Sequence, residues 1–108
     1  MTLSKQLKFN RANIDLMSLT CPGVYVFWFN RMCVYVGKSD RPIRDRLREH
    51  WSSCHNADLR IWIRAYGTKL CFQWECVSEG ESIRAREQYY IDNFKPLTNK
   101  IDSESKTK

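Results

Sequence analysis

The chain has 108 residues, of which 43% are hydrophobic and 28% charged, a balance that fits one globular domain and excludes a disordered chain. No apolar run is long enough to span a bilayer, and charged residues such as Lys5 and Lys8 interrupt the first twenty positions, so we expect no membrane partner, no secretory signal and a cytoplasmic protein. Lys and Arg outnumber Asp and Glu by 18 to 12, a formal net charge of +6. This excess favours a polyanionic partner, most often nucleic acid, although a merely soluble basic surface is the alternative.

The cysteine spacing matches neither a zinc module nor a small disulfide framework. The count is odd and contains no CxxC pair; the cysteines are Cys21, Cys33, Cys54, Cys71 and Cys76. We therefore expect free, partly buried thiols in a reducing compartment, with a zinc site at Cys54-His55 as the alternative.

The first half of the chain predicts a hairpin and a helix. Residues 1–20 show only weak helical spacing and form an N-terminal extension of uncertain structure. Two β-rich runs, Val24–Phe29 and Met32–Val36, flank Asn30-Arg31 and predict a hairpin. Ser39 to Pro42 offers a cap and an early proline for a helix that ends near Ser53.

The second half predicts two helices around one strand. Asn56 or Asp58 opens a helix that Gly67 ends, Leu70–Val77 is a strand, and the last helix runs from about Glu79 to Phe94. The polar residues 101–108 read as a disordered tail. This order predicts an α+β domain over residues 21–100, with a small three-stranded antiparallel or mixed sheet flanked by helices.

Glu87 breaks the pattern of the last predicted helix. On a helical wheel it falls about 40° from Ile83, inside the apolar stripe that contains Tyr90 and Phe94. A carboxylate that faces a core is costly unless a cation or hydrogen-bond donors compensate it. We expect either a buried ion pair or a protonated Glu, or a carboxylate in a cleft that holds Mg²⁺, an ion that completes its shell with water and phosphate oxygens.

Arg46 and His50 lie four residues apart along one border of the apolar stripe of the first predicted helix. A charged imidazole beside a guanidinium is repulsive, so mutual stabilisation does not explain the pair. Both suit a phosphodiester, because Arg46 can stabilise negative charge and His50 can donate or relay a proton. An ordinary amphipathic border is the alternative.

Tyr25 and Tyr35 stand on the two strands of the predicted hairpin. Strand tyrosines usually belong to the core. A two-residue turn at Asn30-Arg31 would place them on opposite faces of the sheet. If both serve one site, the loop must have an odd length or the hairpin must carry a bulge.

Together, these residues resemble the motif series of the GIY-YIG nuclease family. The resemblance runs from about Pro22 to Asn99 and rests on Gly23-Val24-Tyr25, Val34-Tyr35-Val36-Gly37, Arg46 with His50, Glu87 and Asn99 in that order. Its first part is also similar to the incision module of the bacterial excision-repair nuclease, and its last part to phage and intron-type members. Val24 and Val36 replace Ile and remain β-branched.

The resemblance implies a DNA endonuclease, in the cytoplasm of a bacterium or of a phage host, that uses one Mg²⁺ or Mn²⁺. It implies that Glu87 binds the metal and Arg46 holds the scissile phosphate. Tyr25 is the candidate general base or water-orienting group, with Tyr35 beside it. A tyrosine of pKa about 10 is a poor base at neutral pH unless nearby positive charge lowers that pKa.

His50 would assist proton transfer, Asn99 would support the site by hydrogen bonding, and Lys38 would lie near the phosphate. Duplex or structured DNA would be bound mainly through phosphates, with weak sequence specificity and a steep salt dependence. The basic residues expected to contact DNA are Lys38, Arg41, Arg44, Arg48, Arg60, Arg64 and Lys69.

The residues leave several readings open. The fold could serve a non-catalytic DNA-binding domain, or a nuclease that acts on RNA or branched DNA. The protein could be a monomer or a homodimer, and a protein partner could supply specificity. Nicking versus double-strand cleavage, and the biological role, are equally open.

Overall fold

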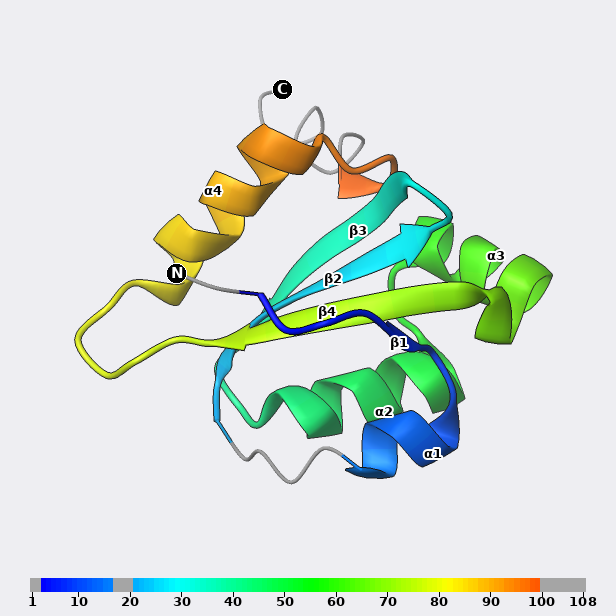
Figure 1. Ribbon diagram of the computed structural model, residues 1–108, viewed down its shortest axis with the longest axis horizontal. Coiled ribbons are helices and arrows are strands. Elements are labelled where there is room, and N and C mark those ends of the chain that lie inside the picture. The colour runs from blue at the N-terminus through cyan, green and yellow to red at the C-terminus, as the bar shows by residue number, and fades with distance from the viewer. Residues whose placement is uncertain (1–2, 17–20, 100–108) are drawn as a thin grey trace.

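The computed structural model describes residues 3–16 and 21–99. Within them, four antiparallel strands form one sheet in the order β1-β4-β2-β3, and helices lie on both faces (Figure 1). The elements are β1 (Leu7–Lys8), α1 (Arg11–Leu16), β2 (Gly23–Phe29), β3 (Met32–Ser39), α2 (Ile43–Ser53), α3 (Ala57–Tyr66), the short 3₁₀ helix η1 (Gly67–Lys69), β4 (Leu70–Cys76) and α4 (Ile83–Phe94). The predicted α+β class is confirmed. None of these helices is long and apolar enough to cross a membrane.

The sheet has a fourth strand that the sequence did not predict. β1 pairs with β4, with Leu7 opposite Phe72. Two residues are too few to show a period of two, so this strand leaves no pattern in the sequence. Phe9 and Ile14, which follow it, are fully buried, so residues 3–16 pack into the core. The expected weak helical spacing at residues 17–20 and the expected tail 101–108 concern residues outside those described.

Capping decides where the helices begin. Asn56 accepts a hydrogen bond from Leu59 N (2.9 Å) and starts α3 as predicted. The last helix starts at Ile83, four residues later than predicted, because Ser82 provides its cap and the residues before it form a turn. Ser39 is the last residue of β3 and does not cap α2, whose N-cap residue is Pro42.

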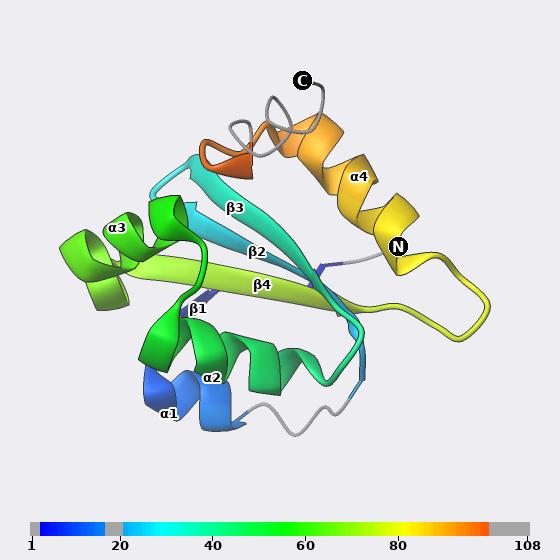
Figure 2. The ribbon, with the colours of Figure 1, turned by 180° about the vertical axis from the view of Figure 1, so that it is seen from behind.

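Helices cover both faces of the sheet (Figure 2), and each face carries its own apolar layer. One face packs against α1, α2 and α3 through a core that contains Phe27, Leu47 and Phe72. The other face packs against α4, where Val24, Val26 and Tyr90 meet. β3 is an edge strand of the sheet and lies between α2 and α4.

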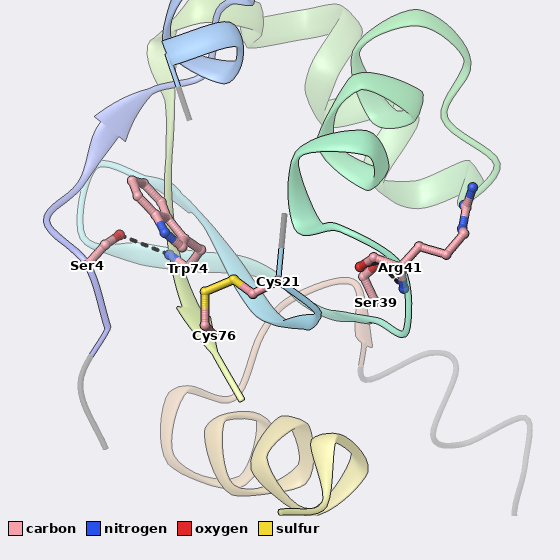
Figure 3. The surroundings of a disulfide bond; sticks show 6 residues. All are labelled: Ser4, Cys21, Ser39, Arg41, Trp74 and Cys76. Carbon is pink, nitrogen blue, oxygen red and sulfur yellow. Dashed lines mark hydrogen bonds between the residues drawn. A yellow bond between two sulfur atoms is a disulfide. The ribbon is translucent and has the colours of Figure 1, made fainter. Parts of the chain in front are cut away.

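Two cysteines form a disulfide, so the expectation of free thiols is wrong for Cys21 and Cys76 (Figure 3). Cys76 ends β4 and pairs across the sheet with Gly23, two residues after Cys21. This pairing brings the two cysteine Cα atoms to 5.7 Å, within the range that a disulfide spans. Because the cysteines are 55 residues apart in the chain, only the sheet pairing brings them together.

Gly37 allows the ring of Tyr25 to lie against β3. The two residues are cross-strand partners, and a Cβ added at Gly37 would stand 2.4 Å from Tyr25 Cζ and 2.5 Å from its hydroxyl oxygen. Tyr25 is fully buried, so its ring has little room to move away. The requirement for glycine here comes from this close approach.

We therefore predict that Gly37→Ala destabilises the fold by about 1–3 kcal/mol, the usual cost of overpacking a core. Urea unfolding of Gly37→Ala, Tyr25→Val and the double variant measures it as a double-mutant cycle. The loss should shrink in the Tyr25→Val background, where the ring is gone. An equal loss in both backgrounds would mean that the Gly37–Tyr25 contact is not the cause.

Candidate active site

A β-bulge places Tyr25 and Tyr35 on the same face of the sheet. Near the turn, Trp28 faces Cys33, but the register then shifts by one residue, so that Phe27 faces Tyr35 and Tyr25 faces Gly37. The two tyrosine rings come within 6.1 Å between centroids. The sequence required an odd loop or a bulge if the two tyrosines were to share a site, and the hairpin has the bulge.

His50 is buried between Tyr25 and Cys54. Its Nε2 lies 2.7 Å from the Tyr25 hydroxyl and its Nδ1 lies 3.2 Å from Cys54 Sγ. The Cys54 thiol in turn donates to the Asn56 carbonyl (3.6 Å). Because the Cys54 proton is donated to Asn56, the Cys54 sulfur can only accept from His50 Nδ1–H. His50 Nε2 then carries no proton and accepts the hydrogen bond from the Tyr25 hydroxyl.

Burial keeps both members of the Tyr25–His50 pair neutral. Burial, then the nearby Arg46 charge, lower the pKa of His50 from 6.5 to about 4. Burial, then Tyr35, raise the pKa of Tyr25 well above 10, and Arg46 opposes this only in part. The imidazole is therefore uncharged at neutral pH, and Tyr25 is a protonated phenol rather than a ready base.

Arg46 borders a small hollow together with Tyr35, Glu49 and His50. Its Nη1 lies 3.1 Å from Glu49 Oε1, and the other oxygen of Glu49 lies 2.6 Å from Arg41 Nη2. One carboxylate thus bridges two guanidinium groups at the mouth of the hollow. An external phosphate has the same charge sign and offers the same type of acceptor oxygens.

Glu87 is half-buried on α4, one turn before the buried Tyr90. Because α4 and α2 cover opposite faces, side chains from the two helices can meet only around the edge strand β3. Within residues 3–16 and 21–99, no group of three His, Cys, Asp or Glu side chains could hold a metal ion. A single carboxylate fits a hard cation such as Mg²⁺, which takes its remaining oxygens from water and phosphate.

Asn99 fastens the outer edge of β3. Its side-chain oxygen accepts from Val36 N (2.7 Å) and its amide nitrogen donates to Val36 O (2.9 Å). Thr98 N donates to Val34 O in the same way (3.0 Å). The buried Asn99 amide therefore holds the backbone between Tyr35 and Gly37, by contacts that reach 63 residues along the chain.

The basic residues expected to contact DNA fall into three groups: those in ion pairs, one that is half-buried, and those that are exposed without an ion pair to another described residue. Arg41 and Arg48 already have carboxylate partners, Glu49 and Asp15 respectively. Arg44 is half-buried on α2. The exposed residues are Lys38, Arg60, Arg64 and Lys69.

Sequence reasoning missed a buried polar cluster beneath α4. Glu75 on β4 is ion-paired with Arg86, and the Tyr90 hydroxyl donates to the other Glu75 oxygen. Burial and the Glu75 carboxylate raise the pKa of Tyr90. Two features of the sequence could have revealed this cluster: Glu75 is a single acid in a β-rich run, and Arg86 and Tyr90 lie four residues apart on one helix face. The roles of Glu49 and Cys54 were also missed.

We predict that acid destabilises the fold through His50. Because the pKa of His50 is about 4 in the folded chain and 6.5 for an ordinary histidine, the unfolded chain binds more protons between these values. The free energy of unfolding should therefore fall by about 2–4 kcal/mol as the pH drops from 6.5 to 4. Urea unfolding across this range should lose most of the slope in His50→Gln and keep it in His55→Gln, an exposed control; an unaltered slope in His50→Gln contradicts this assignment.

A family model described as the GIY-YIG catalytic domain matches residues 21–102. This segment contains every residue of the hollow, the edge strand β3 and α4. No curated protein and no solved structure matches the chain. The matched segment covers most of the chain, which therefore belongs to the GIY-YIG nuclease family.

Proposed function

We propose that the protein is an endonuclease that hydrolyses phosphodiester bonds of DNA with one divalent metal, Mg²⁺ or Mn²⁺. One observation carries this proposal: the hollow beside Tyr35 and Arg46 is backed by the buried Tyr25–His50 hydrogen bond. A cation for phosphate thus stands beside a hydrogen-bonded path for a proton. Phosphodiester hydrolysis needs both.

Arg46 holds the scissile phosphate in this proposal. Its guanidinium offers paired donors that suit phosphate oxygens. Arg46 is ion-paired with Glu49 in this structure, so a bound phosphate replaces the Glu49 carboxylate as its partner. Arg46 then stabilises the charge that grows on the phosphate as water attacks.

The attacking water faces Tyr35, because Tyr35 lines the hollow whereas Tyr25 is fully buried behind it. The water passes its proton to the Tyr35 oxygen, Tyr35 passes its own to Tyr25, and Tyr25 passes its own to His50 Nε2. Each phenol oxygen gains one proton and loses one, so no phenolate needs to form beforehand, and the water oxygen loses its proton as it bonds to phosphorus. Neutral His50, with Nδ1–H directed at Cys54, has its Nε2 lone pair free to accept. Because its lowered pKa disfavours the imidazolium, it holds the proton only until the leaving oxygen takes it.

Glu87 is the residue that would hold the metal, as a single hard ligand on α4. A divalent ion there supplies charge stabilisation for the leaving oxygen. Asn99 supports the site by fixing the β3 backbone beside Tyr35. The exposed basic residues add phosphate contacts that carry no sequence information.

A non-catalytic DNA-binding domain of this fold, and a nuclease for RNA or branched DNA, are the competing proposals. Nicking assays on plasmid, single-stranded DNA, RNA and a flap substrate, with and without Mg²⁺, separate them. Gel filtration with and without DNA tests whether the protein acts as a monomer, a homodimer or with a partner.

Removing one hydroxyl should stop turnover without weakening binding. In Tyr25→Phe the proton path is interrupted, so kcat should fall on the order of 10²–10⁴-fold, while DNA affinity stays within about twofold because no charge changes. Single-turnover cleavage and fluorescence anisotropy measure the two effects. Tyr89→Phe, an exposed tyrosine on α4, is the matched control. Normal cleavage by Tyr25→Phe would contradict the proposed proton relay.

Glu87→Gln should abolish the metal response. The neutral amide is a weaker ligand, so cleavage should fall at least about 100-fold and the Mg²⁺ concentration for half-maximal activity should rise. The control is Glu79→Gln, which removes the same charge from an exposed position. Mn²⁺ binding followed by electron paramagnetic resonance gives a readout without turnover. Equal metal titrations for the two variants would place the metal elsewhere.

A further inference from the structure

Arg60 and Arg64 line a groove between the last turn of α2 and the helix α3. The groove has a volume of about 190 Å³, and its other walls include Trp51, Ser52 and Ile63. Among the described residues, no Asp or Glu lines it. Arg60 and Arg64 stand one helical turn apart and so present their charges on the same side of α3. We call this feature the α2–α3 groove.

These two arginines differ from those of the first site. Arg41 and Arg46 share a carboxylate partner, Glu49. In the part of the chain that the structure describes, Arg60 and Arg64 form no ion pair, and both are exposed. Their charges are available to an external anion without the loss of an internal contact.

The α2–α3 groove and the hollow beside Arg46 are neighbours at the last turn of α2. His50 and Ser53 line both, from opposite sides of the last turn of α2. A chain molecule with one phosphate at Arg46 can therefore follow the surface over this turn and reach Arg60 and Arg64. Such a path requires a ligand with repeated phosphates.

We propose that the α2–α3 groove binds the phosphates that flank the cleaved bond on the substrate strand, through Arg60 and Arg64. The proposal rests on the proposed nuclease function. It selects a nucleic-acid strand over an anionic lipid surface, because a strand with repeated phosphates can reach both the groove and the neighbouring hollow. It also separates these two arginines from the other expected contacts, as the pair that sets the path of the strand.

The experiment compares two double variants that remove the same charge. Arg60→Gln/Arg64→Gln alters the groove, and Arg84→Gln/Lys95→Gln alters exposed positions on and after α4, across the sheet. Fluorescence anisotropy with a short labelled duplex, in EDTA to prevent cleavage, gives affinity against salt concentration. Parallel titrations use single-stranded DNA, RNA and vesicles of anionic lipid.

The groove variant should bind the duplex about 10- to 100-fold more weakly, and its log–log salt slope should be smaller by about 2, since each phosphate contact contributes about 0.9. The control variant should change the slope by less than about half of that. Equal changes in the two variants would show that only net charge matters, and would overturn the proposal. So would a loss confined to the vesicles.

The groove proposal and the nuclease proposal can be contradicted independently of each other. Binding in EDTA needs no catalysis, so a chain that cannot cleave can still show the groove effect. If the wild type cleaves in a Glu87-dependent manner but the groove variant binds like the control, the nuclease proposal stands and the groove proposal falls. At saturating substrate, the groove variant should keep kcat within about threefold and show a raised KM.

Discussion

The hydrogen bond between Tyr25 and His50 joins the central strand β2 to α2, and the candidate site depends on it. The bond forms only because Gly37 leaves room for the Tyr25 ring. The bulge then brings Tyr35 to the same face, and Asn99 holds the edge of β3 beside it. Gly37, the bulge and the Asn99 amide thus act together: they allow the buried Tyr25 hydroxyl to face the neutral His50 ring with Tyr35 beside it.

Charge is arranged differently on the two faces of the sheet. Beneath α4, Glu75, Arg86 and Tyr90 satisfy one another in a buried cluster. On the α2 side, Glu49 bridges Arg41 and Arg46 at the surface, where the pair is weak and exchangeable. A phosphate can therefore replace the exposed Glu49–Arg46 contact far more easily than the buried Glu75–Arg86 contact.

Local signals predicted the elements well where they were strong. The hairpin followed from two β-rich runs around Asn30-Arg31, and α3 from the Asn56 cap and Gly67. The two-residue β1 carries no periodicity and was missed. α4 starts at Ile83, later than predicted, because the Ser82 cap outweighs weak helical spacing in the preceding turn. The disulfide was missed because its two cysteines meet only through sheet pairing.

The sequence alone determined the α+β class, the order of its main elements and the family resemblance, because periodicity, caps and ordered motifs are properties of neighbours in the chain. It also stated the condition under which Tyr25 and Tyr35 share a face. Only the tertiary structure decided that a bulge meets this condition, that His50 is buried and neutral, and that Glu49 occupies Arg46. These depend on contacts between distant residues and on burial, which change a pKa or pair two charges only once the chain has folded.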